Sequence, residues 1–208
     1  MPRPYRLGQR EAASEQTRAR ILAAARELLI ASDGFAAFSM DAVARRADVA
    51  RMTVYHQFGS KIGLLEALCD LLAAGGGMEH MAAAFQQPDP WTALERYVAQ
   101  FGQFWASDRI LTRRLRALAA LDPEFAQVIR ARDEWRRQGL TVLLGRLPGW
   151  SEAPADARAA VVNALFTLLS FEFFDTLAGP DRALDTLAPE VFRLARAALV
   201  AERPGAGA

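Results

Sequence analysis

The chain has 208 residues, of which 52% are hydrophobic and 24% are charged, and its formal net charge is +1. This length and composition are typical of a soluble globular protein with one large or two small domains, and they exclude a largely disordered chain. Positive charge is concentrated near the N-terminus, where residues 1–62 carry ten Arg or Lys against six Asp or Glu, a surplus that a phosphate-binding module requires.

Cysteine and histidine content limits the chemistry that we expect. A single cysteine, Cys69, excludes an intramolecular disulfide, and no charged start leads into an apolar signal segment, so we expect a cytoplasmic protein. Cys69 lies in a leucine-rich helical pattern and is interpreted as a small buried residue, with a redox sensor as the alternative. His56 and His80 have no carboxylate or thiolate ligands at metal spacing, so we expect no metal site and no cofactor.

The N-terminal segment, residues 1–16, is basic, contains two prolines and a glycine, and lacks sustained periodicity. It is expected to be a mobile arm that either stays in solvent or enters a DNA minor groove. From Thr17 onward, apolar residues recur at helical spacing and predict a helix that ends near Gly34 in the left-handed position.

The stretch from Ser39 to Lys61 predicts two short helices joined by a tight turn. The first, residues 40–47, begins behind Ser39, whose hydroxyl can cap free amides, and Asp48 tolerates the left-handed turn. The second, residues 51–58, places Val54 and Phe58 inward and directs a polar set outward. Such a face suits a DNA groove, and it consists of Arg51, Met52, Thr53, Tyr55, His56 and Gln57.

These residues resemble the TetR-type transcriptional regulators over about residues 17–65. The DNA-binding segment of that family ends in a Thr, an aliphatic residue, Tyr, two variable positions, Phe and a short loop to a Lys; here these are Thr53, Val54, Tyr55, His56, Gln57, Phe58 and Lys61. The resemblance implies that Tyr55 and Lys61 contact phosphates. The full set expected at DNA is Ser39, Met40, Arg51, Met52, Thr53, Tyr55, His56, Gln57 and Lys61.

Four positions depart from the family pattern and leave operator sequence and affinity open. Asp48 stands where Gly is common, and Ala50 replaces a capping Ser or Thr, a loss that typically costs about 1 kcal/mol. Met52 stands where Gly or Pro is frequent. Gly63 replaces the Glu that usually closes the capping box begun by Ser60.

A leucine-rich helix after Lys61 is interrupted by Gly75, Gly76 and Gly77. Three glycines cost roughly 3 kcal/mol in a helix interior, at about 1 kcal/mol each, so we predict a break there. This break is either a passive linker or a hinge that transmits ligand binding to the DNA-binding module.

The remaining chain is predicted to be helical over residues 91–107, 110–121, 124–147, 155–178 and 184–201. The uncharged run 159–171 is too short to span a bilayer and is interpreted as a buried helix. The last two helices carry long apolar stripes and predict a homodimer packed as a four-helix bundle. The expected interface residues are Val161, Leu165, Leu168, Leu184, Leu187, Val191 and Leu194.

Aromatic residues are frequent in the middle of the chain. Taken singly they are typical of core packing, but as a group with interleaved polar side chains they indicate a pocket for a small apolar, aromatic effector. Arg114 is the expected polar anchor. The candidate lining is His80, Met81, Phe85, Phe101, Phe104, Trp105, Arg114, Leu118, Trp135, Phe166 and Ser170.

The sequence therefore predicts an all-α protein with an arm (1–16), a helix-turn-helix domain (17–62), an effector-binding and dimerisation domain (63–203) and a disordered tail (204–208). The favoured function is a homodimeric repressor that binds a pseudo-palindromic operator and is released by its effector. Two alternatives remain. One is a helical interaction protein with a degenerate helix-turn-helix; the other is an all-helical enzyme, for which no nucleophile–base pair, metal set or cofactor cradle is found.

Overall fold

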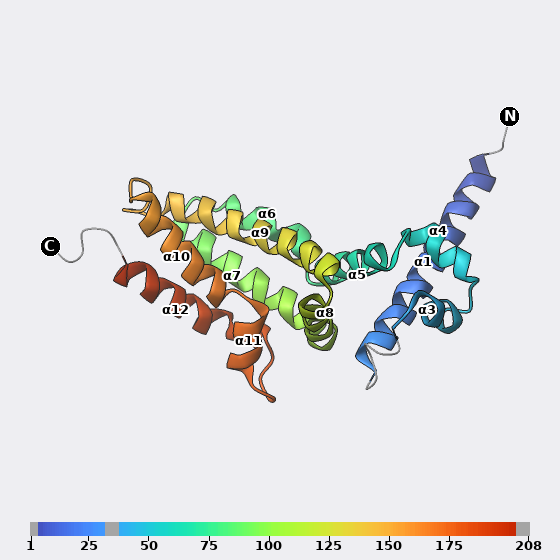
Figure 1. Ribbon diagram of the computed structural model, residues 1–208. Helices are drawn as coiled ribbons and strands as arrows, with labels where there is room; N and C mark the ends of the chain where they lie inside the picture. The colour runs from blue at the N-terminus through green and yellow to red at the C-terminus, as the bar shows by residue number, and fades with distance from the viewer. Residues whose placement is uncertain (1–3, 32–37, 203–208) are drawn as a thin grey trace. The chain divides into compact units, whose positions relative to one another are not determined.

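The computed structural model describes residues 4–31 and 38–202, with side chains from residue 11 onward. The described residues form helices and connecting turns, with no strand among them, which confirms the all-α class (Figure 1). In chain order the elements are α1 (Pro4–Ile30), α3 (Met40–Arg46), α4 (Arg51–Phe58), α5 (Lys61–Gly75), the 3₁₀ turn η1 (Met78–Met81), α6 (Ala82–Phe85), α7 (Pro90–Ser107), α8 (Arg109–Leu121), α9 (Pro123–Arg146), α10 (Ala155–Leu168), α11 (Phe171–Ala178), the 3₁₀ turn η2 (Asp185–Leu187) and α12 (Ala188–Ala201).

Helix α1 begins well before the predicted start at Thr17. The expectation of an irregular arm is wrong for residues 4–16, which are helical. Proline is tolerated at Pro4 because the first helical turn needs no amide donor there, and Ala, Glu and Gln favour helix in the residues that follow. The predicted helix end at Gly34 lies outside the described residues.

The chain divides into two compact units. The N-terminal unit runs through Leu71 and includes Arg113–Ala126, and the C-terminal unit comprises Leu72–Thr112 and the chain from Gln127 onward. This division differs from the single boundary predicted after residue 62, because parts of α5, α8 and α9 belong to the N-terminal unit. The core of that unit contains fully buried side chains from α1, α3, α4 and α5: Ile21, Leu29, Val43, Val54, Leu64 and Leu68.

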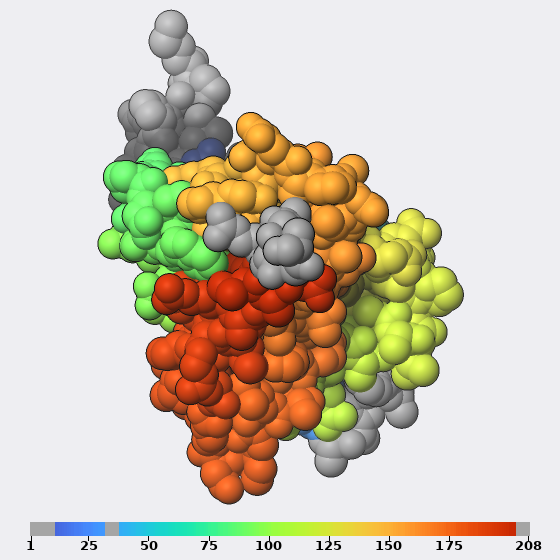
Figure 2. Space-filling view, turned by 90° about the vertical axis from the view of Figure 1, so that its left-hand side faces the viewer, coloured from blue at the N-terminus to red at the C-terminus, as the bar shows by residue number. Residues whose placement is uncertain are grey.

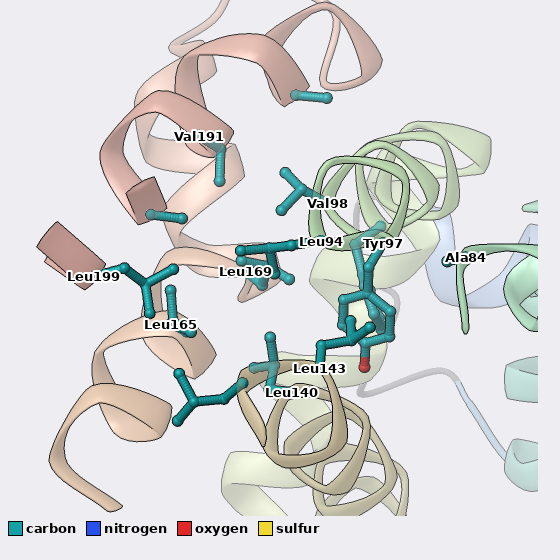
Figure 3. Packing of buried hydrophobic residues seen from close by; sticks show 14 of the residues in the cluster. Ala84, Leu94, Tyr97, Val98, Leu140, Leu143, Leu165, Leu169, Val191 and Leu199 are labelled. Atoms are coloured by element: carbon teal, nitrogen blue, oxygen red, sulfur yellow. The ribbon is translucent and has the colours of Figure 1, made fainter. Parts of the chain in front are cut away.

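In the C-terminal unit, apolar side chains from four helices meet around α7 (Figure 3). Each of the following is at most 2% exposed: Leu94, Tyr97 and Val98 from α7, Leu140 and Leu143 from α9, Leu165 and Leu169 from α10 and its end, and Val191 and Leu199 from α12. This layer fixes the helices that carry the aromatic residues of the middle of the chain.

The helix predicted over residues 155–178 is broken into α10 and α11. Ser170 begins α11, because its hydroxyl accepts a hydrogen bond from the Phe173 amide at 3.1 Å and donates to the Thr167 carbonyl at 2.7 Å. The indole Nε1 of Trp105 donates to the Leu169 carbonyl at 3.1 Å, so the carbonyl freed by the break is paired. Ser170 therefore acts as a helix cap.

Membrane-spanning character is weak in the described residues. None of their helices alone has the length and apolarity of a span, and α10 with α11 passes that test only as a pair bent by 48°. Both helices bury apolar side chains, including Val161, Leu165, Phe171 and Phe174, in the core of the C-terminal unit.

Of the three glycines after the leucine-rich helix, Gly76 packs closely against another helix, whereas Gly75 has open space around it. Helix α5 continues through Gly75, and Gly77 turns the chain with φ at +69°. Gly76 lies against α7, where an added Cβ would be 2.7 Å from the Phe104 Cα. The Gln100 amide also donates to the Gly76 carbonyl at 2.8 Å. Gly76 is therefore required by helix packing.

Most residues predicted for the dimer interface lie in the core of their own chain. Val161, Leu165, Leu184, Leu187 and Val191 are each at most 1% exposed. That part of the interface prediction is wrong, because an apolar stripe shows that a helix face is covered but does not show which element covers it. Among the predicted set, Leu168 is half-buried and Leu194 is 37% exposed.

Candidate functional site

The turn between α3 and α4 is closed by a Schellman motif, in which the last carbonyls of a helix are paired beyond its end. The Val49 amide donates to the Ala44 carbonyl at 3.1 Å, and the Asp48 amide donates to the Arg45 carbonyl at 3.3 Å. Asp48 occupies the left-handed position with φ at +51°, as the sequence predicted. The two helices thus cross as a helix-turn-helix.

Serine hydroxyls cap α3 and α5, whereas α4 has no side-chain cap. The Ser39 hydroxyl accepts a hydrogen bond from the Ala42 amide at 3.2 Å, which fixes the start of α3. Ala50 precedes α4 and provides no side-chain cap, so the predicted loss of a capping hydroxyl is confirmed. The Ser60 hydroxyl accepts from the Gly63 amide at 3.0 Å and caps α5.

Position 63 requires glycine for a steric reason that the sequence does not show. A Cβ at this position would lie 2.1 Å from the Phe58 carbonyl oxygen, which is far inside van der Waals contact. The end of α4 and the start of α5 therefore approach too closely for the Glu that the family pattern favours.

The outward face of α4 is partly as predicted. Arg51, Met52 and His56 are exposed, with Met52 at 73%, while Thr53 and Tyr55 are half-buried. An exposed methionine on a polar helix face has no packing role in the N-terminal unit. These side chains are available to a DNA groove.

Arg51 is held by two groups of its own unit. Its Nη2 donates to the Tyr55 hydroxyl at 3.3 Å, and its Nε lies 3.1 Å from the Asp41 carboxylate on α3. The Tyr55 hydrogen bond and then the Asp41 charge raise the pKa of the Arg51 guanidinium. A base contact by Arg51 requires that it leave Asp41, a competing residue that the sequence reasoning missed.

Two residues predicted at DNA face elsewhere. Met40 is 7% exposed and belongs to the core, because the first residue of α3 points inward. The Gln57 amide donates to the Ser14 hydroxyl on α1 at 3.0 Å, and the Gln57 carbonyl accepts from Arg18 at 3.1 Å. Arg18 also stacks over the Phe58 ring at 4.4 Å. Ser14 and Arg18 were not predicted, because their pairing depends on how α1 packs.

Lys61, at the start of α5, lies beside the helix-turn-helix, and its side chain is 41% exposed. Its Nζ is 3.9 Å from the Asp122 carboxylate and 5.9 Å from the Phe38 ring centroid. Asp122 also accepts from the Glu124 and Phe125 amides at 3.2 Å and so caps α9. The ammonium is therefore paired weakly, at a distance that lets it turn towards a phosphate.

The C-terminal unit gathers most of the predicted effector-binding aromatics. From Phe85 to Tyr97, Phe101, Trp105 and Phe171, successive ring centroids lie 5.6, 5.1, 5.8 and 5.7 Å apart. Phe104 lies 4.4 Å from Trp105, and Met81 is 5% exposed against the same core. Phe166 is half-buried beside them.

Four residues of the predicted effector-binding lining lie outside this aromatic cluster. A fifth, Ser170, caps α11. His80 is largely exposed and lies 3.6 Å from Glu79, and Trp135 is 72% exposed. Arg114 and the buried Leu118 belong to the N-terminal unit, where Arg114 donates to the Ala31 carbonyl at 3.4 Å. Helical periodicity alone did not separate these faces.

The residues that build the helix-turn-helix also match a known family. Residues 21–68 fit the family model described as bacterial regulatory proteins, tetR family, and this segment holds α3, α4 and the first half of α5. Residues 21–68 therefore form a DNA-binding segment of the tetR family type. With its motif formed and its α4 face exposed, the chain has the DNA-binding domain of a transcriptional regulator. No curated protein matches the chain.

Solved structures of tetR-like regulators share the fold over most of the chain. NalD of Pseudomonas aeruginosa, the secondary repressor of the MexAB-OprM multidrug efflux pump, is 24% identical, with a TM-score of 0.66 over 89% of this chain and 96% of that one. PfmR, a TetR family transcriptional regulator of Thermus thermophilus, is 23% identical, with a TM-score of 0.63 over 85% and 96%. The fatty acid degradation regulator FadR of Bacillus halodurans is 19% identical, with a TM-score of 0.61 over 86% and 94%. At these identities the likeness shows the fold.

Proposed function

We propose that this tetR-family regulator is a homodimeric repressor that binds a pseudo-palindromic operator and is released by a small apolar, aromatic effector. The observation that carries the proposal is the exposed face of α4, with Arg51, Met52 and His56, beside Lys61 at the start of α5. NalD, a protein of similar fold, is named as a repressor. That name supports the direction of regulation.

The DNA contacts divide into two kinds. Lys61 and Tyr55 bind phosphates, which positions the protein without reading sequence. Arg51, Met52 and Thr53 face base edges in the major groove, and Arg51 reads a guanine once it leaves Asp41. Ser39 and His56 are also exposed.

Dimerisation uses the outward faces of the last helices. Figure 2 shows the surface of α12 in red beside the orange surface of α10 and α11, and α10 packs against α12 within the chain. On α10, Ala160, Ala164 and Leu168 follow one another at four-residue spacing, and α12 adds Leu194 and Ala197. Small side chains let two such helix pairs approach closely, as in a four-helix bundle.

One experiment tests the DNA-binding proposal directly. The full chain is used to select fragments from randomised and genomic DNA, and the enriched sequences are then measured by mobility shift. Enrichment of an inverted repeat supports the proposal. Failure to bind any fragment favours the helical interaction protein with a degenerate helix-turn-helix.

A further inference from the structure

Helix α9 buries a charged side chain among aromatic rings. Arg136 is 3% exposed, and its guanidinium carbon lies 5.8 and 5.7 Å from the ring centroids of Phe101 and Trp105 on α7 and 4.2 Å from that of Phe166 on α10. Its Nη2 is 3.3 Å from the carboxylate of Asp133, one turn earlier on α9. Removing a guanidinium from water costs several kcal/mol unless such contacts offset it.

Two half-buried arginines of the same unit have an evident structural role. Arg109 donates to the Gly179 carbonyl at 2.6 Å at the end of α11, and Arg146 donates to the Phe85 carbonyl at 2.8 Å at the end of α6. Both pair backbone carbonyls at helix ends. The guanidinium of Arg136 lies against ring faces in the interior and beside the Asp133 carboxylate. Rings stabilise a cation by about 0.5 to 2 kcal/mol each, but the planar fork of donors is matched best by a carboxylate.

The backbone that carries Arg136 is fixed in place. The Tyr97 hydroxyl donates to the Arg136 carbonyl at 2.9 Å, and burial raises the pKa of that hydroxyl, which keeps it a donor. Gly139 makes room for this contact, because a Cβ there would be 2.4 Å from the Tyr97 oxygen. The guanidinium is thus presented from a rigid position.

Phe166 connects the buried guanidinium with one nearer the surface. The guanidinium carbon of Arg137 also lies 4.2 Å from the Phe166 centroid, and the Arg137 side chain is 34% exposed. Arg137 is paired with Glu134 at 3.7 Å and donates to the Asn163 amide oxygen. The half-buried Phe166 ring is thus in contact with both guanidinium groups.

We propose that Arg136 anchors the carboxylate of an aromatic acid, whose ring takes a place among Phe101, Trp105 and Phe166 after entering past Arg137. This inference rests on the proposed function for the existence of an effector, and it names the chemical class of that effector. Arg136 replaces Arg114 as the polar anchor, because Arg114 lies in the N-terminal unit. The incoming carboxylate displaces Asp133, whose side chain is 22% exposed and can turn to solvent, so the buried guanidinium stays paired.

The test compares 2-naphthoate with its neutral counterpart 2-naphthamide by isothermal titration calorimetry on the full chain. We expect the acid to bind at least about tenfold more tightly than the amide, because a charged hydrogen-bonded pair is worth about 1.5 to 3 kcal/mol. Equal affinities, or no binding of the acid at millimolar concentration, overturn the proposal. This comparison needs no variant.

Variants then assign the preference to one side chain. Arg136→Met keeps an unbranched apolar stem and removes the charge, so it should lose the preference for the acid and still bind the amide. Arg136→Lys keeps the charge without the fork and should fall between Arg136→Met and the parent. Arg130→Met, at an exposed site on the same helix, should bind both probes as the parent does. An unchanged preference in Arg136→Met assigns the anion to another site.

Operator binding, measured by fluorescence anisotropy, separates this inference from the proposed function. If 2-naphthoate binds through Arg136 but leaves operator affinity unchanged, the anchor stands and release by this effector class fails. If 2-naphthamide releases the operator as well as 2-naphthoate does, the regulator stands and the anchor fails.

Discussion

Asp48 combines a structural and an electrostatic role at the centre of the helix-turn-helix. Its left-handed φ of +51° permits the Schellman closure of α3, while its exposed carboxylate adds negative charge to the module that approaches phosphates. An L residue in this conformation is strained by about 1 kcal/mol or more, less for Asp than for most residues. The family preference for Gly at this position follows from the same geometry.

We expect Asp48→Gly to tighten binding to all DNA sequences by up to about fivefold, since removing one like charge near phosphates is worth about 1 kcal/mol. Its unfolding free energy should change by less than about 1 kcal/mol, because relief of strain is offset by the greater entropy of Gly in the unfolded chain. Asp48→Asn removes the charge alone and should reproduce the gain in affinity. Anisotropy titrations measure the DNA affinity of each variant, and urea unfolding measures its stability. Unchanged affinity in both variants would place Asp48 away from DNA.

Lys61 is the residue whose substitution tests phosphate binding most directly. We expect Lys61→Ala to weaken binding to all sequences and to lower the slope of log affinity against log salt by about one unit, because one phosphate contact is lost. Arg96→Ala removes the same charge from an exposed position on α7 and should leave the slope unchanged. A slope that is identical in Lys61→Ala and the parent contradicts the assignment.

At the scale of elements, close approach between helices decides where glycine is needed in α5. Gly63→Ala adds a Cβ 2.1 Å from the Phe58 carbonyl, whereas Gly75→Ala meets nothing within 4 Å. We expect Gly63→Ala to lower the unfolding free energy by about 1 to 3 kcal/mol, although Ala has the higher helix propensity. Gly75→Ala, in the same helix, should be neutral or stabilising by up to about 1 kcal/mol. Urea unfolding tests both, and equal effects would contradict the steric explanation.

Gly76 changes how the hinge hypothesis is tested. Because its Cβ would meet the Phe104 Cα at 2.7 Å, replacing all three glycines by Ala would disturb packing against α7 as well as stiffen the segment. The hinge stays a prediction. Gly75→Ala alone tests stiffening, through its effect on the coupling between effector and operator binding.

The helix-turn-helix was predictable because its signals are local. A capping serine, inward Val54 and Phe58 four residues apart, and a turn residue that tolerates positive φ determine the helix bounds within a few residues. Side-chain partners such as Asp41 with Arg51 follow from packing between helices and were missed. The break at Ser170 was missed too, since its apolar surroundings read as one continuous helix.

Periodicity in the C-terminal helices showed apolar faces without showing what covers them. Val191 and Leu165 were assigned to a dimer interface, but they pack against the core of the same chain, and Trp135 was assigned to a pocket although it is exposed. Sequence spacing carries no distance between elements, so it cannot distinguish a face covered within the chain from one covered by a partner.

At the scale of the whole molecule, the proposed operator recognition depends on two copies of α4 held by one dimer. A two-fold dimer places its recognition helices about one turn of DNA apart, roughly 34 to 36 Å or a multiple, which requires an inverted-repeat operator. A single α4 of eight residues offers few base contacts, so loss of the dimer should lower operator affinity far more than affinity for random DNA.

Leu194→Glu tests this dimer, because it introduces a charge into the proposed interface at a site that is 37% exposed in the single chain. We expect sedimentation of this variant as a folded monomer at micromolar concentration, with at least about tenfold weaker operator binding, since an unpaired carboxylate in an apolar interface costs several kcal/mol. Val200→Glu makes the same kind of change on another side of α12, where Val200 is 58% exposed, and should remain dimeric. Circular dichroism confirms that both variants fold. If Leu194→Glu stays dimeric while Val200→Glu dissociates, the interface lies on the opposite side of α12. If the parent chain itself sediments as a monomer, an inverted-repeat operator loses its physical basis.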